Sequence, residues 1–414
     1  MTQKLPYKEI RNAAIVLAQT DESKRNRFLE HLSRELITHK KKILAANRAD
    51  VRAAEKKGLA AAFVQRLVLD EHGFALLKRK LADVRKLKSG IGETISTSRE
   101  RGGLILKKVR VPLGVLAVIY EARPEVTLDV AALCVKSGNA AILKGGSEAL
   151  KTNAALYECI SGALKKSGLP SASVAFIKTG DRSVTNELMG RHDVVDLVIA
   201  RGSYGMVQAV MDRSTIPVLA HASGGARIFV DDTADQEAAV RILVNAKITK
   251  PAACNTVDTI LVHKKIAKVF IPKIVAALIA KNVRVKGDVA SMKFAKVEKA
   301  SEKDWDTEYL GMAVSIKVVS GVEEAVVFTN AHSKRHTEGI LSRTKKSIDY
   351  YLRSVDAAAL FVNASTRLHD GFVFGLGSEM GISTAKLHAR GPVGLKELTT
   401  YKWEVFGHGN IREN

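Results

Sequence analysis

The sequence predicts an α/β protein made of two doubly wound αβα domains, each built on a mainly parallel sheet. Three observations favour this fold class. From Val111 onward, short apolar runs alternate with helical stretches, an order typical of parallel sheets covered by helices. Hydrophobic residues make up 46% of the chain, which is enough for a large core. At roughly 150 residues per domain, the 414 residues predict two or three domains.

Residues 1–88 precede the sheet and are predicted to form helices. Apolar side chains such as Phe28, Leu32 and Leu36 recur at helical spacing, with Lys, Arg and Glu between them. Around Gly90–Gly103 the composition turns to Gly, Ser and Thr, and this change predicts a break in the helical region.

The first α/β series follows this break. Its predicted strands are Leu116–Tyr120, Ala140–Lys144, Val174–Ile177 and Asp196–Ile199. Its predicted helices are Pro124–Lys136, Glu148–Lys166 and Tyr204–Arg213. Because a doubly wound sheet binds ligands at the carboxyl ends of its strands, we expect a ligand site there.

A second series begins near a Gly-Gly turn. The turn and the predicted strand, helix and strand that follow it are Gly224 with Gly225, Ile228–Val230, Asp235–Ala246 and Thr259–Val262. Further α/β units are expected as far as Asn363. The tail from Lys386 carries Thr, Tyr, Trp and Val, which are typical of one more strand.

The positive charge of the chain has two interpretations. The formal net charge of +22 is scattered along the sequence, and it fits either Lys-rich helices that face water or a field that attracts anionic ligands. Aromatic residues make up only 5%, and zinc-finger, basic-zipper and RNA-recognition signatures are absent from the sequence. We therefore predict phosphorylated metabolites, and no nucleic acid, as ligands.

Other patterns exclude further classes of protein. No run approaches the ~18 apolar residues of a membrane span, and the N-terminus lacks an export signal. Three cysteines outside any CxxC pair cannot form a disulfide framework, so we expect a cytoplasmic protein that makes no membrane contact. HExxH, GxSxG, Walker A and EF-hand patterns do not occur in the sequence, and we predict no metal site.

Cys254 differs from the other two cysteines in its context. Cys134 and Cys159 lie in helical patterns, where a small thiol usually fills the core. Cys254 lies in KPAACNT, a predicted loop between a helix and a strand, and loops on a rigid scaffold display reactive groups. A thiol reacts as thiolate, which nearby cations or N–H groups favour. This pattern leaves both a catalytic and a structural role open for Cys254.

The segment AAILKGGSEA indicates a second candidate site. Lys144 ends a predicted strand, and Gly146 and Ser147 lead into a helix, so a cation and exposed N–H groups follow the strand. Gly202 and Ser203 form a similar corner in LVIARGSYG. Two such corners in one sheet favour one long cofactor. The spacing is not GxGxxG, and ordinary strand–turn–helix corners remain the alternative.

Four long blocks resemble the gamma-glutamyl phosphate reductase family, a branch of the aldehyde dehydrogenase superfamily. They are VPLGVLAVIYEARPEVTLDVAALCVKSGNAAILKGGSEA, KPAACNTVDT, VDAAALFVNASTR and HARGPVGLKELTTYKW, in this order along most of the chain. The resemblance implies an aldehyde dehydrogenase-like fold. It also implies that NADPH reduces L-glutamyl 5-phosphate to L-glutamate 5-semialdehyde in proline biosynthesis, with the upstream glutamate kinase as a candidate partner.

The resemblance implies roles for single residues as well. Cys254 matches the family's thiol nucleophile, Lys144 its lysine at the adenosine ribose, and Glu308 its glutamate at the nicotinamide ribose. The implied cofactor contacts are Lys144, Gly146, Ser147, Gly202, Ser203 and Glu308. The implied substrate contacts are Asn363, Ser365, Thr366, Arg367 and Arg390. Arg367 is the best candidate for an anion contact because a guanidinium can bind carboxylate or phosphate through two hydrogen bonds; a structural ion pair is its alternative role.

The implied mechanism is covalent. The Cys254 thiolate expels phosphate from the acyl phosphate, and hydride reduces the resulting thioester to the aldehyde. Hydrolytic aldehyde dehydrogenases carry a water-activating Glu before a Gly-Gly pair, where this chain reads HASGG, so no general base is expected to hydrolyse the thioester. Glu125, Ala226 and Arg227 depart from the family pattern. The alternatives are an acylating aldehyde dehydrogenase on another acyl donor and a catalytically weakened paralogue that acts as a binding protein.

These expectations divide the chain into three parts. Residues 1–220 form the expected cofactor-binding domain, interrupted near residues 90–110 by an oligomerisation hairpin. Residues 221–374 form the expected catalytic domain with Cys254, and residues 375–414 form the expected return and oligomerisation tail. The hairpin and the tail predict a homodimer or homotetramer.

Overall fold

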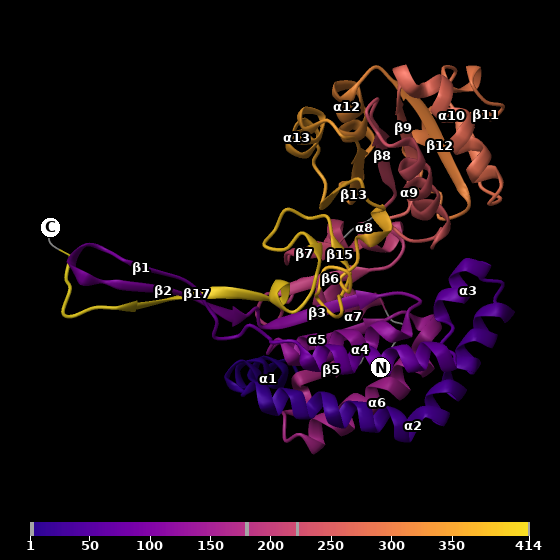
Figure 1. The fold of residues 1–414 in the computed structure, drawn as a ribbon. Coiled ribbons are helices and arrows are strands. Elements are labelled where there is room, and N and C mark those ends of the chain that lie inside the picture. Colours follow the sequence, from indigo (N-terminus) through magenta and orange to yellow (C-terminus); the bar gives the residue numbers. More distant parts are fainter. Residues whose placement is uncertain (1–3, 179–181, 221–222, 413–414) are drawn as a thin grey trace. The chain divides into compact units, whose positions relative to one another are not determined.

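The computed structural model describes residues 4–178, 182–220 and 223–412 (Figure 1). The chain divides into two compact units. The first unit comprises Met1–Ala222, Phe374–Gly381 and Leu387–Asn414, and the second comprises Ser223–Val373 and Ile382–Lys386. The domain boundary that the sequence predicts, at residues 220 and 221, adjoins residues 221–222, which lie outside the described residues.

Four helices open the first unit: α1 (Tyr7–Gln19), α2 (Glu22–Lys56), α3 (Ala61–Leu67) and α4 (Glu71–Lys86). In α2, apolar side chains recur on one face, and Phe28, Leu32 and Leu36 are buried there. This face packs against α6 (Leu150–Lys166). The residues with helical spacing in the sequence therefore form helices, as predicted.

A parallel five-stranded sheet lies at the centre of the first unit. In spatial order its strands are β5 (Val174–Phe176), β4 (Ala140–Gly145), β3 (Val115–Tyr120), β6 (Leu197–Arg201) and β7 (Val218–Ala220). The accompanying helices are α5 (Pro124–Lys136), α6, α7 (Arg182–Leu188) and α8 (Tyr204–Arg213). All side chains of β3 and β4 are buried, as expected for the centre of a covered sheet. The strand order reverses between β3 and β6, and ligands bind at such reversals.

A three-stranded antiparallel sheet extends from the first unit as an arm (Figure 1). Its strands are β1 (Thr94–Arg99), the central β2 (Ile105–Pro112) and β17 (Thr399–Phe406). The hairpin and the C-terminal strand that the sequence predicts thus meet in one sheet. Tyr401, Trp403 and Val405 alternate along β17 and are exposed on one of its faces.

The second unit contains a parallel seven-stranded sheet. In spatial order its strands are β11 (Glu298–Lys299), β10 (Arg284–Gly287), β12 (Ala313–Val319), β9 (Val257–His263), β8 (Ala226–Val230), β13 (Thr337–Leu341) and β14 (Ala359–Val362). Its helices are α9 (Gln236–Ile248), α10 (Lys264–Ile279), α11 (Glu302–Trp305), α12 (Val322–His332) and α13 (Lys345–Ser354). The short remaining elements are η1 (Arg101–Gly103), η2 (Ser147–Ala149), η3 (Ser171–Ser173), η4 (Ser291–Lys293), η5 (Thr366–Leu368), η6 (Lys396–Leu398), β15 (Ile382–Ser383) and β16 (Gly391–Pro392).

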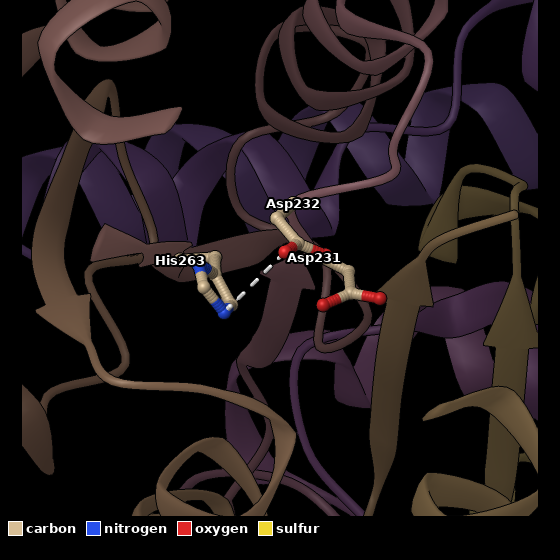
Figure 2. Close-up of side chains that lie close together, drawn as sticks. All are labelled: Asp231, Asp232 and His263. Atoms are coloured by element: carbon tan, nitrogen blue, oxygen red, sulfur yellow. Dashed lines mark ion pairs between the residues drawn. The ribbon is translucent and has the colours of Figure 1, made fainter. Parts of the chain in front are cut away.

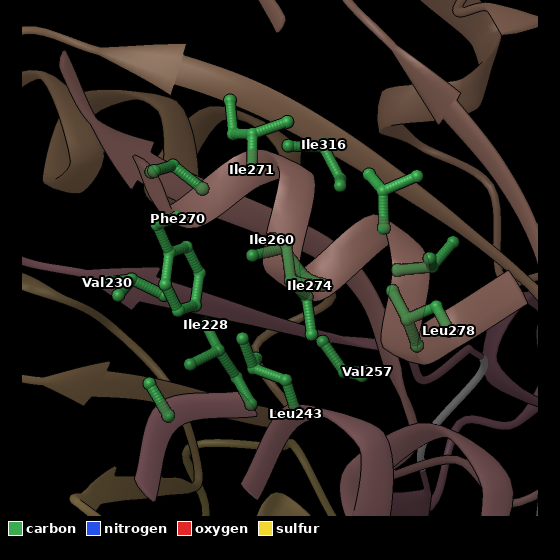
Figure 3. Packing of buried hydrophobic residues seen from close by; sticks show 14 of the residues in the cluster. Ile228, Val230, Leu243, Val257, Ile260, Phe270, Ile271, Ile274, Leu278 and Ile316 are labelled. Carbon is green, nitrogen blue, oxygen red and sulfur yellow. The ribbon is translucent and has the colours of Figure 1, made fainter. Parts of the chain in front are cut away.

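A hydrophobic core joins this second sheet to α9 and α10 (Figure 3). Ile228 and Ile260 of the sheet pack with Phe270 and Ile274 of α10, and with Leu243 of α9. Burial of such side chains contributes about 1.5–3 kcal/mol each. The core therefore fixes the end of α9 and the start of β9, and Cys254 lies in the loop between them.

The predicted helix Glu148–Lys166 is wrong at its start. Residues Ser147–Ala149 form a 3₁₀ turn, and α6 begins at Leu150. The cause is Glu148, whose Oε1 accepts a hydrogen bond from the backbone N–H of Ala122 at 2.6 Å. The sequence pattern does not predict α7 and β7, because both are too short to show a strong apolar period.

Candidate active site

Cys254 lies in residues 249–256, the segment between α9 and β9, which we call the Cys254 loop. Hydrogen bonds within the loop fix its shape: Thr256 donates from its backbone N–H to Ala253 O at 3.0 Å and from Oγ1 to Lys250 O at 2.7 Å. Cys254 is half-buried, whereas Cys134 and Cys159 are fully buried and burial raises the pKa of both thiols. Cys254 is therefore the thiol that a ligand can reach.

The Gly224–Gly225 turn, hereafter the glycine turn, packs directly against Cys254. A Cβ at Gly224 would lie 2.3 Å from Cys254 O and 2.5 Å from Cys254 Cβ. The backbone N–H of Gly225 donates to Cys254 O at 2.7 Å, and Gly225 has φ +91°, a region that favours glycine. The absence of side chains in the turn thus gives Cys254 its position.

Arg367 contacts the Cys254 loop through Asn255. Its Nη1 donates a hydrogen bond to Asn255 Oδ1, while Asn255 Nδ2 donates to His369 O at 2.8 Å. Burial lowers the pKa of Arg367, and its electrostatic attraction to Cys254 and Asp370 opposes that shift. A guanidinium beside the loop that carries this thiol can bind an anionic ligand. The structure therefore brings together Cys254 and Arg367.

The other predicted substrate contacts have different surroundings. Asn363 bonds the backbone of Ser342, accepting from its N–H at 2.9 Å and donating to its carbonyl at 2.8 Å. Ser365 Oγ donates to Asn245 Oδ1 at 2.7 Å. Thr366 is fully buried, and Arg390 belongs to the first unit. Contacts with substrate at these four positions remain predictions.

Glu308 lies between α11 and β12 in the second unit. Its Oε2 accepts a hydrogen bond from Ser223 Oγ at 3.1 Å. Ser223 directly precedes the glycine turn. His221 and Ala222 of the HASGG segment lie outside the described residues. The predicted contact between Glu308 and a ribose remains a prediction.

Arg227, one of the departures from the family pattern, supports the glycine turn. Its Nη1 donates to Gly225 O at 3.2 Å, and its backbone N–H donates to Glu338 Oε2 at 2.6 Å. Both side chains are fully buried and form an ion pair at 3.6 Å. Burial raises the pKa of Glu338 to about 7, although the Arg227 charge opposes this shift. Arg227 therefore has a structural role within the site.

A pocket of about 530 Å³ lies in the first unit, where β3, β4 and β6 end. Lys144, Gly146, Ser147 and Ser203 line it, together with side chains of α7 and α8. Lys144 Nζ donates to Gly145 O at 3.0 Å. The structure thus unites the two glycine corners that the sequence predicts to bind one cofactor.

The corner before α8 is held by a carboxylate of the chain itself. Glu121 Oε2 accepts from the backbone N–H of Ser203 at 2.7 Å. A Cβ at Gly202 would lie 2.6 Å from this oxygen and 2.3 Å from Met206 Cε, so only glycine leaves the corner undisturbed. A ligand phosphate at this helix terminus would meet Glu121 as well as the N–H groups.

Comparisons with known proteins identify the family of the chain. The sequence profile of the aldehyde dehydrogenase family matches residues 7–294. A gamma-glutamyl phosphate reductase of Thermoanaerobacter sp. (strain X514) is 42% identical over 414 residues, 100% of both chains, and one of Clostridium beijerinckii is 43% identical over 403 residues, 97% of each chain. The crystal structure of gamma-glutamyl phosphate reductase from Thermotoga maritima, 41% identical, superposes with a TM-score of 0.96 and covers 98% of this chain and 99% of that chain. The chain belongs to the gamma-glutamyl phosphate reductase branch of the aldehyde dehydrogenase family.

Membership of the reductase family confirms the predicted fold class and the resemblance read from the four sequence blocks. The contact between Asn255 and Arg367 was missed, because 112 residues separate the two along the chain. Also missed were Lys247 and Asp258, a buried ion pair at 2.9 Å on either side of the Cys254 loop. The signal in the sequence was Lys247, a lysine in a largely apolar helical segment.

One cluster of possible metal ligands lies elsewhere in the second unit of this reductase-family chain (Figure 2). Ligand atoms of Asp231, Asp232 and His263 lie within 4.8 Å of one another. Asp231 Oδ2 accepts from Ser342 Oγ at 2.6 Å, and Lys265 donates from Nζ to Asp232 at 2.9 Å and from its backbone N–H to His263 Nδ1 at 3.1 Å. These hydrogen bonds and the Lys265 charge already account for the three groups.

In the part of the chain that the structure describes, no helix combines the length and the apolar character needed to cross a bilayer.

Proposed function

We propose that this chain reduces L-glutamyl 5-phosphate to L-glutamate 5-semialdehyde with NADPH, through a thioester on Cys254, in proline biosynthesis. The observation that carries the proposal is the half-buried Cys254 thiol, seated on the glycine turn and beside the Arg367 guanidinium. Full-length relatives named gamma-glutamyl phosphate reductase support this substrate.

Arg367 and Cys254 suit an acyl phosphate. The substrate carries two anionic groups, a phosphate and a carboxylate, and a guanidinium binds either through charge-assisted hydrogen bonds. Arg367 already bonds Asn255, so its guanidinium is oriented before substrate binds. Burial raises the pKa of Glu125 and so disfavours its negative form, which reduces the conflict between this departure and an anionic ligand.

The first half of the reaction forms the thioester. The Cys254 thiolate attacks the acyl carbon, the sulfur–carbon bond forms, and phosphate leaves with the electrons of the broken carbon–oxygen bond. The oxygen that becomes negative needs a donor, and the backbone N–H of Cys254 is our candidate. The HASGG segment carries no carboxylate that could activate water against the thioester, so phosphate is the natural second substrate in the reverse direction.

A nicotinamide cofactor fits the pocket at Lys144. The volume of about 530 Å³ is typical of a small-molecule site, and Lys144 and Arg213 bring positive charge to its lining. At Gly146 the backbone passes so close to Glu148 that a Cβ would lie 2.0 Å from Oε1. We propose that Lys144, Ser147 and Ser203 hold the adenosine part and Glu308 a ribose. Bound NADPH supplies the hydride for the reduction, and cleavage of the sulfur–carbon bond then restores the Cys254 thiolate.

The reverse reaction tests the proposal. Wild-type protein should reduce NADP when semialdehyde and phosphate are both present. Cys254→Ser should lower this rate at least about 10³-fold because the covalent route is lost. Its affinity for NADP should stay unchanged, and the matched variant Cys159→Ser should remain active. Absence of wild-type activity would contradict the proposal, and activity with coenzyme A in place of phosphate would favour the acylating alternative.

We also propose that the arm builds a homodimer or homotetramer. The exposed apolar side chains of Tyr401, Trp403 and Val405 support an interface there. The kinase that makes glutamyl phosphate is a candidate partner, and co-sedimentation of the two purified proteins tests that association.

A further inference from the structure

A lysine is fully buried at the base of the Cys254 loop. Lys247, in the last turn of α9, donates from Nζ to Asp258 Oδ1 at 2.9 Å and to Val257 O at 3.1 Å. Neither side chain of the ion pair is more than 3% exposed. Lys247 precedes the loop and Asp258 follows it, so the pair ties together the two chain segments between which Cys254 lies.

Asp258 also packs against the glycine turn. A Cβ at Gly225 would lie 2.5 Å from Asp258 Oδ2, so this oxygen lies close against the turn. The backbone N–H of the same glycine donates to Cys254 O at 2.7 Å. Asp258 therefore touches the two structures that set the position of Cys254: the end of its loop and the turn on which it rests.

The stability of the fold does not explain two buried charges at this place. Burial lowers the pKa of Lys247 and raises the pKa of Asp258, and the attraction between them opposes both shifts. Apolar residues of similar volume often replace a buried ion pair with neutral or stabilising effect. What an apolar pair cannot provide is a directional bond from the ammonium to one carboxylate oxygen and one carbonyl.

We propose that Lys247 and Asp258 are positioning residues for Cys254. Their ion pair fixes both ends of the Cys254 loop and the glycine turn, and so holds the sulfur beside Arg367. The consequence for turnover rests on the proposed function, whereas the consequence for the reactivity of Cys254 does not depend on the substrate.

The decisive variant is the double substitution Lys247→Met with Asp258→Leu, which replaces the charges with apolar side chains. Its chemical denaturation midpoint should match or exceed that of Lys247→Met alone, which strands a carboxylate. Its kcat in the reverse assay should nevertheless stay about tenfold or more below wild type, with KM for semialdehyde within about threefold, because misplacement of the reacting group lowers the rate. Lys136→Met is the matched control, since Lys136 is a fully buried lysine of the first unit paired with Glu22.

A second measurement follows the thiol alone. The rate of Cys254 alkylation by iodoacetamide, read by peptide mass mapping, should fall about tenfold in the double variant, because the loop and the glycine turn no longer hold the sulfur in its position. The buried Cys134 and Cys159 serve as internal references. Asp258→Asn keeps the shape of the side chain and removes its charge, and it should lower the alkylation rate about threefold or more. This single variant provides the test if the double variant does not fold.

The outcomes separate the two proposals. If alkylation is slower in the variants, the positioning role is supported. If the wild-type protein in addition does not turn over semialdehyde, only the proposed function is contradicted. Wild-type alkylation rate and kcat in a folded double variant, or an unchanged alkylation rate in Asp258→Asn, overturns the positioning role.

Discussion

The guanidinium of Arg367 donates a hydrogen bond to the side chain of Asn255, the residue that follows Cys254. This bond ties the guanidinium to the loop that carries the thiol. A charge held in this way is oriented before an anionic substrate arrives, which lowers the entropic cost of binding.

Arg367→Met should therefore weaken substrate binding. Loss of hydrogen bonds to a charged group, worth about 1.5–3 kcal/mol, predicts a KM for glutamyl phosphate raised about 10- to 100-fold. Steady-state kinetics at saturating NADPH measures it. Arg343→Met, which removes an exposed guanidinium paired with Asp235, should leave KM within about twofold. Equal KM values in the two variants would rule out an anion contact at Arg367.

Gly224→Ala should displace Cys254. The new Cβ would overlap the backbone of Cys254, so the sulfur has to shift, and a shift of about 1 Å in a reacting group can lower kcat about 100-fold. NADP affinity, measured by calorimetry, should not change. Gly311→Ala is the control, because its Cβ would approach Tyr309 O only to 3.5 Å, an ordinary contact. Full activity of Gly224→Ala would show that the turn does not set the position of Cys254.

Lys144→Met should weaken cofactor binding. The cation lines the pocket at the end of β4, and loss of a charge-assisted contact predicts a Kd for NADP about 10- to 100-fold higher. Turnover at saturating cofactor should stay within about threefold. Titration of protein fluorescence gives the Kd, with the exposed Lys151→Met as control. An unchanged Kd would remove Lys144 from the cofactor site.

His336 should make the second unit sensitive to acid. Burial lowers the pKa of His336 to about 4 from 6.5, so the folded state binds fewer protons than the unfolded state between these values. The contribution of His336 to the free energy of unfolding is therefore lost as pH falls from about 6.5 to 4, and it amounts to about 3 kcal/mol. Glu338, whose pKa is raised to about 7, contributes with the opposite pH dependence.

The substitution His336→Asn should remove the contribution of His336 to the pH dependence of the free energy of unfolding. Urea unfolding at several pH values, followed by the fluorescence of buried Trp305, measures the slope; Trp403→Phe removes the chain's other tryptophan. The exposed His72→Asn should retain the wild-type slope. The same slope in wild type and His336→Asn would show that this imidazole does not titrate in unfolding.

Lysines on the arm should dissociate the proposed oligomer. Trp403→Lys with Val405→Lys places two charges on the exposed apolar face of β17, and an ammonium buried in an interface is strongly unfavourable. Sedimentation velocity should then show monomers at micromolar concentration. Ile411→Lys, at a position 84% exposed, should leave the assembly intact. An unchanged sedimentation coefficient would exclude this face from the interface.

Much of the fold could be predicted because its signals are local. The central strands β3, β4 and β9 consist mainly of apolar residues, so they were found within one or two residues of their observed bounds. The 3₁₀ turn that precedes α6 was not predicted; there Glu148 accepts a hydrogen bond from the backbone N–H of Ala122, 26 residues away. Local propensity cannot foresee a partner distant in the chain.

The candidate site divides in the same way. The context of Cys254 and the corner at Lys144 were readable from neighbouring residues, whereas the contact of Arg367 with Asn255 depends on how β9 and η5 are placed by the sheet. Substrate contacts of the NASTR block remain predictions, and the sequence did not indicate that Asn363 hydrogen-bonds Ser342 and that Ser365 hydrogen-bonds Asn245. A shared motif fixes their order in the chain and says nothing of their partners.

The arm has a consequence for how the protein is made on the ribosome. β2 (residues 105–112) is synthesised early, whereas its partner β17 (residues 399–406) lies near the end of the chain. One edge of β2 therefore stays unpaired while most of the nascent chain emerges. Open strand edges invite pairing with the wrong chain. Ribosome-associated chaperones should therefore engage residues 94–112 during translation, and stop codons placed before Thr399 should yield polypeptides that aggregate.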